Sequence, residues 1–392
     1  MKLCIIQAVL PLYVISFFNR ITELFPSIEL TVVVDLESAE PLNQYRGEDL
    51  KFKVVHVPQL HQSGVVWRKG LLKVLRGLQA DMVVFSGSTR DLSQLFAMLH
   101  HRILGKRFGV WGMFHRVGGP RFVTNAYFRM VGMLASRCLT YSRMGAVNLV
   151  GLGVTKDKVG VVGTAIDESK PHFQMLARTH DELAQFRSHH GLIGKHVILQ
   201  VVRLSRIKRP ELLIDAATAL QCVRRDLVFA LIGDGEMRHE LETRVNNRGL
   251  QENFRFIGAV YDEAELSRWY LCADAFVVPT FIGLSAHHAM SYGVPVITDD
   301  SLDSQGSEFD ILSPGLNSLT YCEGDPNDLA EVLARLVSSP DLRSFLAINA
   351  RKTIDNVHNL DNKTKNFVKQ VLQIGPLAME FPKKFGQGTK DV

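Results

Sequence analysis

The sequence predicts an α/β protein with two domains, each built on a parallel β-sheet that helices cover on both faces. Its 392 residues are too many for one ordinary hydrophobic core and suit two α/β domains. Short apolar runs typical of buried strands alternate with helix-like segments along the chain, which is the rhythm of repeated βα units. The rhythm begins again at His196, so the second half repeats the organisation of the first.

The first residues of the chain are expected to form a buried strand rather than a signal peptide. Gln7 and Pro11 interrupt the apolar run, and no clear small-residue cleavage site follows. We therefore expect a strand, a loop and then a helix here, and no membrane-spanning segment elsewhere. The strands expected in the first half are residues 3–9, 31–36, 53–57, 82–87, 108–113 and 138–142.

A helix is expected from about Asp91 to Leu104, with Gly105 suited to its C-terminal cap. Its apolar residues recur at helical spacing, so they share one stripe, and we expect this stripe to face the core. His101 and Arg102 are expected on the opposite, basic face, which leads to Lys106 and Arg107. The stripe consists of Leu92, Leu95, Phe96, Leu99 and Ile103.

The sequence of the second half predicts a similar series of strands and helices. A strand at residues 196–202 is followed by a loop and by a helix with Pro210 at its first position, where proline is well tolerated. We expect domains at residues 1–168 and 196–379, an interdomain segment at residues 169–195 and a flexible tail at residues 380–392. Further strands are expected at residues 227–233, 254–258, 275–279 and 294–298.

Cysteine usage and charge restrict the class of protein. The five cysteines are scattered and none forms a CxxC pair, which argues against a disulfide scaffold or a zinc site and for a reducing cytosol. Residues 1–168 carry 20 Lys and Arg against 12 Asp and Glu, and residues 68–143 carry 13 against two. A face for an anionic partner, such as membrane headgroups, and a merely solvated basic surface both fit this charge. Nothing here has the interleaved aromatics of a nucleic-acid-binding pattern.

The stretch from Pro279 to Thr298 predicts an anion-binding turn. A strand ends at Pro279, Gly283 and Leu284 follow, and a short helix comes next. The free N–H groups at a helix N-terminus, together with the helix dipole, favour a bound anion. Because Gly283 has no Cβ, a ligand can approach the backbone closely there.

Two cations suggest a second part of the same site. Arg203 and Lys208 flank the loop between the strand at residues 196–202 and the helix that begins at Pro210. Cations at a strand's carboxyl end, next to a helix N-terminus, form a diphosphate clamp, although two ordinary surface cations would give the same sequence. In a doubly wound sheet this loop and the turn at Gly283 are close enough to share one ligand.

The second half resembles the donor domain of retaining glycosyltransferases of family 4, of the glycosyl transferases group 1 type. The first half resembles the family more weakly, through LPLYVISFF, GKRFGVWGM and the residues around LGVTKDKVGVVGTAID. The resemblance implies the GT-B fold, in which two Rossmann-like doubly wound parallel-sheet domains face each other. The first domain would then be the acceptor side and the second the donor-binding side. The segments that carry the resemblance are VVRLSRIKRPELLIDA, LIGDGEM, FRFIG, ADAFVVPTFIGLSAHHAMSYGVPVIT, and GSEFDIL with GDPNDLAEVL.

The resemblance also implies roles for single residues. Arg203 and Lys208 would bind the donor diphosphate and stabilise it as it leaves. The family usually has two glutamates seven residues apart, where this chain has Thr280 and His288, and a subset with an IGLxAxH-type loop shares this departure. Thr280 would contact the sugar and His288 the ribose. The full set of implied donor-binding residues is Thr280, Ile282, Gly283, Leu284, Ser285, His288 and Glu308.

Three further residues are weaker candidates. His115 follows the strand at residues 108–113 and would be the family's catalytic histidine, although that histidine often comes directly after Trp-Gly, where Met113 stands here. Asp299 and Asp300 follow a strand, and could contact sugar hydroxyls or cap the next turn. No DxD motif lies near a strand end, so no metal is implied.

The resemblance implies transfer of a sugar from a nucleotide diphosphate sugar to a hydroxyl of a glycan or lipid-linked acceptor, with retention of configuration. Surface polysaccharide, lipopolysaccharide or glycolipid biosynthesis would be the setting, in the cytoplasm with peripheral contact at the inner face of the membrane. We expect no cofactor besides the donor and no nucleic acid. A nucleotide-sugar epimerase lacks the acidic residues for proton transfer. A catalytically degenerate subunit, which binds a nucleotide sugar or a partner glycosyltransferase, remains the alternative because both glutamates are missing.

Overall fold

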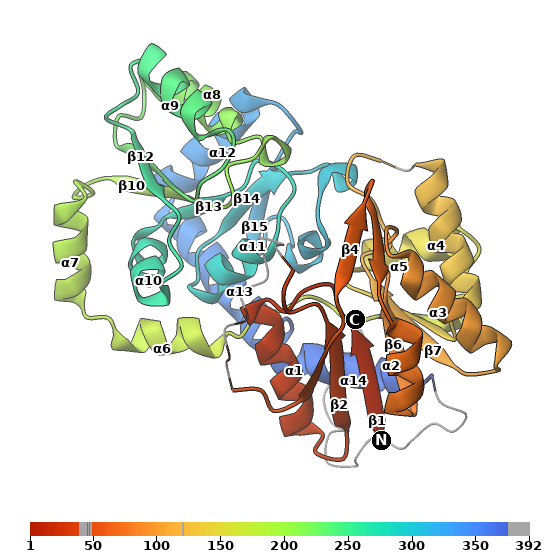
Figure 1. The fold of residues 1–392 in the computed structure, drawn as a ribbon. Helices are drawn as coiled ribbons and strands as arrows, with labels where there is room; N and C mark the ends of the chain where they lie inside the picture. The colour runs from red at the N-terminus through yellow and green to blue at the C-terminus, as the bar shows by residue number, and fades with distance from the viewer. Residues whose placement is uncertain (39–44, 46, 48, 120, 375–392) are drawn as a thin grey trace. The chain divides into compact units, whose positions relative to one another are not determined.

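The computed structural model describes residues 1–38, 45, 47, 49–119 and 121–374, and the chain divides into two compact units (Figure 1). Unit 1 holds the described residues of 1–116, 121–164 and 360–374, and unit 2 holds 117–119 and 165–359. The predicted tail, residues 380–392, lies outside the described residues. No helix in the described part of the chain is long and apolar enough to cross a membrane.

Unit 1 is built on a parallel sheet of seven strands in the order β3-β2-β1-β6-β7-β8-β9. Its central strands are buried on both faces, as expected when helices cover both sides of a parallel sheet. An antiparallel hairpin, β4–β5, lies outside this sheet and was not predicted. The strands are β1 (Lys2–Ile6), β2 (Glu29–Val34), β3 (Lys53–His56), β4 (Gln59–Gln62), β5 (Val65–Arg68), β6 (Met82–Ser86), β7 (Phe108–Gly112), β8 (Arg137–Thr140) and β9 (Val159–Val161).

The helices of unit 1 include one that comes from the far end of the chain. Helix α14 contacts α1 and β8, and its Phe367 packs edge-to-face on Phe17 at 5.4 Å between ring centroids. Residues from Leu360 therefore group with unit 1, whereas the sequence placed residues 196–379 in one domain. The helices are α1 (Leu12–Leu24), α2 (Leu71–Leu78), α3 (Leu92–Ile103), α4 (Phe122–Leu134), α5 (Arg143–Gly151) and α14 (Leu360–Leu372).

Helix α3 is rotated relative to the prediction: the predicted apolar stripe faces outward, and a side that combines Ala97 and Met98 with polar residues faces inward. Asp91, Ser93 and Gln94 are buried, and Gln94 Nε2 donates to Ser86 Oγ at 2.7 Å. Arg68, also buried, donates from Nε to Asp91 Oδ2 at 2.6 Å. These polar groups must be satisfied by one another, and that requirement helps to fix which side of the helix turns inward. The predicted core stripe was therefore wrong: Leu92, Phe96, Leu99 and Ile103 are exposed.

His101 was also misplaced by the sequence, which put it on the basic outer face. The ring is buried, with Nδ1 2.9 Å from the carbonyl oxygen of Ala97, and it packs edge-to-face on Phe85. Burial lowers the pKa of His101 below its ordinary value, although the contact with Ala97 works the other way. His101 is thus a neutral packing residue and adds no charge to the surface near physiological pH.

Unit 2 is built on a parallel sheet of six strands in the order β12-β11-β10-β13-β14-β15. Counted from β10, this is the strand order 3-2-1-4-5-6 of the Rossmann fold. The strands are β10 (His196–Val201), β11 (Leu227–Ile232), β12 (Phe254–Gly258), β13 (Ala275–Val277), β14 (Val296–Asp299) and β15 (Ser318–Tyr321). The helices are α6 (Ser169–Ala177), α7 (His180–His189), α8 (Glu211–Leu220), α9 (Arg238–Asn247), α10 (Glu263–Cys272), α11 (Leu284–Ser291), α12 (Pro326–Ser338) and α13 (Pro340–Asn356).

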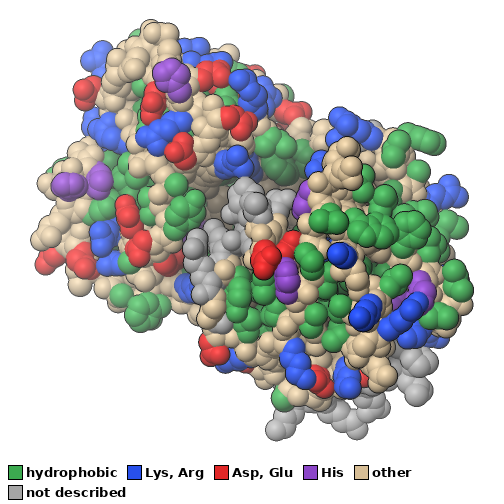
Figure 2. Space-filling view, in the orientation of Figure 1, with side chains coloured by type: hydrophobic (Ala, Val, Ile, Leu, Met, Phe, Trp, Pro, Cys, Tyr) green, Lys and Arg blue, Asp and Glu red, His purple; other side chains and the backbone are tan. Residues whose placement is uncertain are grey.

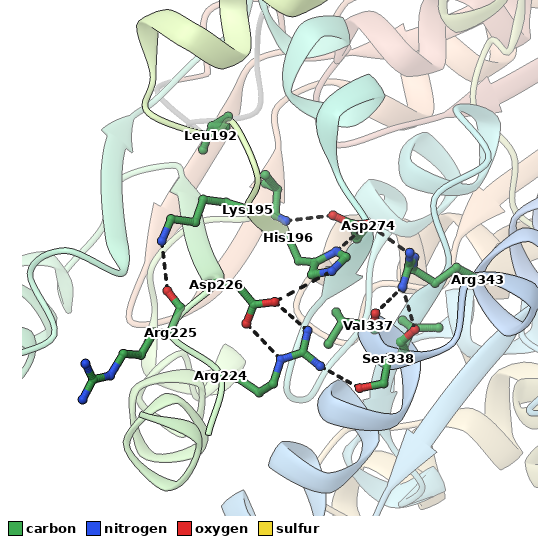
Figure 3. Close-up of polar contacts among 12 residues, drawn as sticks. Leu192, Lys195, His196, Arg224, Arg225, Asp226, Asp274, Val337, Ser338 and Arg343 are labelled. Carbon is green, nitrogen blue, oxygen red and sulfur yellow. Dashed lines mark hydrogen bonds and ion pairs between the residues drawn. The ribbon is translucent and has the colours of Figure 1, made fainter. Parts of the chain in front are cut away.

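A polar network closes the amino ends of the central strands of unit 2 (Figure 3). Asp274, just before β13, accepts one hydrogen bond from Val197 N at 2.9 Å, and its Oδ1 lies 3.1 Å from His196 Nδ1. Arg224 pairs with Asp226, just before β11, at 2.8 Å. Ligands of open α/β sheets bind at the opposite, carboxyl ends of the strands, so we interpret this network as a structural brace.

Candidate functional site

The candidate site lies where the strand order of unit 2 reverses. Strands β10 and β13 are hydrogen-bonded neighbours in the sheet but are separated by β11 and β12 in the chain. Two loops leave their carboxyl ends side by side, one carrying Arg203 and Lys208 and the other Thr280 to Gly283. Ligands of doubly wound sheets bind in the crevice at this kind of reversal. The predicted closeness of the two loops is therefore confirmed.

The loop after β10 rests on the turn that follows β11. Leu204 N donates to the Asp234 carbonyl at 3.0 Å, and Met237 N donates to the Leu204 carbonyl at 3.1 Å. At Gly233, whose φ is 134°, an added Cβ would lie 1.9 Å from the Val202 carbonyl oxygen. Only glycine fits this contact. The GDGE segment thus acts as a support that shapes the cation-bearing loop.

Lys208 links the two loops directly. Its Nζ donates a hydrogen bond to the carbonyl oxygen of Phe281 and lies 4.5 Å from the centre of the Phe281 ring. Burial lowers the pKa of Lys208 to about 8, and the carboxylate of Glu308 opposes that shift. The ammonium is therefore held at the carboxyl edge of the sheet with only partial compensation of its charge.

Arg203 differs from Lys208 in having no partner of its own. Its side chain is exposed, and it makes no hydrogen bond or ion pair within the described part of the chain. The neighbouring Arg206 instead pairs with Glu240 at 3.5 Å. Arg203 is thus available to an anionic ligand without first breaking an internal contact.

A cation and a helix N-terminus converge at Gly283. Gly283 is the N-cap residue of α11, and no side chain caps that helix. A Cβ added at Gly283 would lie 3.6 Å from Lys208 Nζ, so the ammonium is beside the first turn, which begins with Leu284 and Ser285. Helix dipole and lysine charge therefore add at one place, as a phosphate group requires.

Gln305 shapes the loop after β13, and sequence reasoning missed it. Its buried side chain accepts from Ile282 N at 2.9 Å and donates to Thr298 Oγ1 at 2.9 Å and Asp299 Oδ1 at 2.8 Å. The next residue, Gly306, approaches the Ile282 carbonyl so closely that an added Cβ would lie 2.4 Å away. In the QGSEF segment the sequence indicated only Glu308 as a candidate site residue. Gln305 was not indicated, because no local pattern marks a glutamine as buried.

The two residues that stand in place of the family's glutamates have different surroundings. Thr280 is buried, with its hydroxyl 3.4 Å from the carbonyl oxygen of Ser304. His288 is one-fifth exposed, and its Nε2 lies 2.7 Å from Glu263 Oε1. Tyr292 donates to the same oxygen at 2.6 Å.

Glu263, at the start of α10, supplies a carboxylate that the sequence did not reveal. Burial works to raise its pKa, but the hydrogen bonds from His288 and Tyr292 outweigh burial and hold the pKa below the ordinary value. The carboxylate lies within hydrogen-bonding distance of His288 Nε2, at 2.7 Å, and therefore orients that ring. Glu263 is thus placed to orient the side chain at position 288.

Asp299 and Asp300 hold turns. Ser301 N donates to Asp299 Oδ1 at 3.1 Å, and Glu323 N donates to Asp300 Oδ1 at 3.2 Å. Burial raises the pKa of Asp299, against the hydrogen bonds it accepts. Of the two roles weighed from the sequence, the contacts favour the capping role.

His115 belongs to unit 1, whereas the other candidate residues belong to unit 2. Its ring is buried, with Nδ1 3.2 Å from the carbonyl oxygen of Met113. It follows Phe114, which has a left-handed φ of 52°. The tight turn after β7 therefore orients this histidine.

Sequence comparison relates unit 2 to a known family. Residues 184–353 match the family model of the Glycosyl transferases group 1. An uncharacterized glycosyltransferase of Methanocaldococcus jannaschii is 27% identical over 57% of this chain and 55% of its own length. A D-inositol 3-phosphate glycosyltransferase of Thermomonospora curvata is 30% identical over 60% of this chain and 54% of its own. The chain thus spans about half the length of these relatives.

Structural comparison extends to nearly the whole chain. HepE of Anabaena, in a crystal structure with UDP, superposes with a TM-score of 0.72 at 16% identity, over 94% of this chain and 98% of that one. At such low identity the likeness is one of fold. The prediction of the GT-B fold, with two Rossmann-like domains, is confirmed.

Proposed function

We propose that this protein is a retaining glycosyltransferase that uses a nucleotide diphosphate sugar as donor and a hydroxyl of a glycan or lipid-linked molecule as acceptor. The observation that carries the proposal is the meeting of Lys208, the α11 N-terminus and the partner-free Arg203 at the strand-order reversal of unit 2. This arrangement suits two adjacent phosphates. The UDP bound to HepE, which shares the fold, supports a nucleotide as the ligand.

In the proposed sugar transfer, the main contribution of the side chains is positive charge that stabilises the leaving diphosphate. As the bond from the anomeric carbon to the diphosphate breaks, negative charge grows on the leaving phosphate. Arg203, Lys208 and the helix N-terminus would stabilise that charge, while the phosphate accepts the acceptor's proton on the same face of the sugar. His115 would contact the transferred sugar. Neither a pair of catalytic carboxylates nor a cofactor is required.

The rival function is a degenerate subunit that binds a nucleotide sugar without turnover. It is favoured by the absence of a carboxylate at Thr280 and His288. A panel of nucleotide diphosphate sugars separates the two functions: binding is measured by calorimetry, and release of free nucleotide diphosphate over hours reports slow hydrolysis. Release from one donor supports the enzyme. Tight binding with no release, with or without glycan and lipid-linked acceptors, would favour the degenerate subunit.

The low pKa of Lys208 predicts a pH dependence of nucleotide affinity. The ammonium form binds phosphate, so the Kd for UDP should be constant below about pH 8 and rise about tenfold per pH unit above it. Calorimetry between pH 6.5 and 9.5 measures this. Lys208→Arg should flatten the profile, because a guanidinium does not titrate in this range. A wild-type profile as flat as that of the arginine variant would contradict the assignment.

Glu263 and His288 should act as one unit. We expect His288→Ala and Glu263→Ala to weaken donor binding by a similar factor, about tenfold, the order of one hydrogen bond to a charged or polarised group. The double variant should then be no weaker than either single one, because each change removes the same contact. Titration with UDP measures all three. Additive effects would show that Glu263 does not act through His288.

The proposed acceptor places the protein in surface polysaccharide, lipopolysaccharide or glycolipid biosynthesis, in the cytoplasm and at the inner face of the membrane. The excess of basic residues in the first half supports contact with an anionic acceptor or with anionic lipid. Product analysis with lipid-linked and free glycan acceptors tests this part separately from donor use.

A further inference from the structure

Unit 1 presents an apolar face that has no covering element in the described part of the chain. Along α3, Leu92, Phe96, Leu99 and Ile103 point outward, and Ile103 is 83% exposed. The side of the helix that is buried instead carries Ser93, Gln94, Ala97, Met98 and His101. An amphipathic helix turned in this way leaves its apolar stripe to something outside the fold.

Neighbouring elements extend the face. Trp67 of the β4–β5 hairpin is half exposed and packs edge-to-face on Phe96 at 5.7 Å between ring centroids. Helix α4 contacts α3 and exposes Phe122 (89%), Val123 (79%) and Met133 (56%). In Figure 2, hydrophobic side chains gather over the part of unit 1 where Figure 1 draws α3, α4 and α5. We call the exposed apolar residues of α3, α4 and β5 the apolar face.

Basic side chains accompany the apolar face, and acidic ones do not. Arg102, Lys106 and Arg129 are exposed on α3, the turn after it, and α4. The only acidic residues between positions 68 and 143 are Asp81 and Asp91. Asp91 is buried in its pair with Arg68, and Asp81 precedes β6 at the amino end of the sheet, where it accepts from Lys2 N. The face is therefore apolar and positive.

A face that is both apolar and positively charged favours one kind of binding partner, an anionic bilayer. A second copy of the chain would bring two positive faces together, which costs free energy unless anions intervene. An anionic bilayer instead offers hydrocarbon for Phe96, Ile103 and Phe122 and negative headgroups for the arginines and lysine. Trp67 adds an indole, the group enriched at membrane–water interfaces.

We infer that the apolar face of α3, α4 and β5 inserts shallowly into a bilayer containing anionic lipid and holds unit 1 at the membrane surface. This surface would place the protein where a lipid-linked acceptor resides. The inference rests on the proposed function for the identity of the acceptor, but membrane binding itself requires no turnover.

Co-sedimentation of the full chain with vesicles tests the inference. Vesicles of phosphatidylcholine alone are compared with vesicles that contain one-third phosphatidylglycerol, at low and high salt. Wild type should bind the anionic vesicles at low salt. The double variant Phe96→Ser/Ile103→Ser should partition at least about tenfold less, because two large side chains no longer enter hydrocarbon. Arg102→Gln and Lys106→Gln should each lower partitioning onto the anionic vesicles about fivefold and reduce its dependence on salt.

The matched control is Phe345→Ser on α13 of unit 2, where the phenylalanine is 49% exposed against 54% for Phe96. It should bind vesicles like wild type. UDP binding, measured on every variant, should be unchanged, which separates loss of docking from failure of the proposed function. Equal vesicle binding by wild type and the double variant would overturn the inference. So would a dimer, detected by sedimentation velocity, that the double variant dissociates.

Discussion

Arg203→Ala and Lys208→Ala are each expected to lower turnover at least about a hundredfold, the usual order for losing one group that stabilises a developing charge. The physical reason is the same for both: less positive charge faces the leaving diphosphate. Their effects on the free protein should differ. Arg203 has no internal partner, so its loss should leave stability unchanged, whereas Lys208 also bonds the Phe281 carbonyl and its loss should loosen that loop. Steady-state release of nucleotide diphosphate and thermal unfolding measure the two effects.

Arg206→Ala is the matched control for both substitutions. Arg206 lies in the same loop, but its side chain is 74% exposed and pairs with Glu240. Exposed pairs of this kind contribute little to stability, so turnover and unfolding should stay near wild type. Near-normal turnover of Arg203→Ala and Lys208→Ala would refute the clamp. An equal loss in the Arg206 variant would mean that the loop responds to any change of charge.

Gln305→Ala is expected to lower the free energy of unfolding by about 3 kcal/mol, because it removes the hydrogen bonds of the Gln305 amide to the buried Ile282 N–H, to the Thr298 hydroxyl and to Asp299. The loop that carries Phe281 and Gly283 should then lose its shape, and UDP affinity should fall with it. Chemical denaturation and calorimetry measure the two quantities. Gln251→Ala is the control, since Gln251 is exposed and makes one long contact, 3.4 Å, with the Asn246 carbonyl.

Gln305→Glu keeps the shape of the side chain and gives a sharper test. At neutral pH it would set a second carboxylate against Asp299, whose pKa burial already raises. Repulsion raises the folded-state pKa of such a pair above the unfolded value, so stability should be gained as pH falls from 7 to 5 and lost as it rises. Wild type should show a smaller gain, because only Asp299, whose pKa is raised by burial, contributes to it. A stable glutamate variant with a flat profile would mean that the Gln305 amide is not what holds the loop.

The Gly283 turn and the clamp loop could be recognised from the sequence because their chemistry is local. A glycine before a short helix and two cations after a strand can each be recognised from residues that are neighbours in the chain. The reversal of strand order then places the two loops side by side, as expected. Gln305 and Glu263 could not be recognised in this way. Each acts on a residue at least 23 positions away, Ile282 in one case and His288 in the other, and nothing near either of them indicates the partner.

The α3 helix gives the clearest division between what the sequence by itself determined and what only the tertiary structure decided. Periodicity determined that the helix exists and which residues share a stripe, because helical spacing is a property of neighbours along the chain. It could not determine which side turns inward. The side that turns inward joins Ala97 and Met98, which pack in the core, to the buried polar cluster of Arg68, Asp91, Ser93 and Gln94, whose hydrogen bonds must be made within the fold. Satisfying those groups left Phe96 and Ile103 outside, because one helix cannot bury both of its faces against a single sheet.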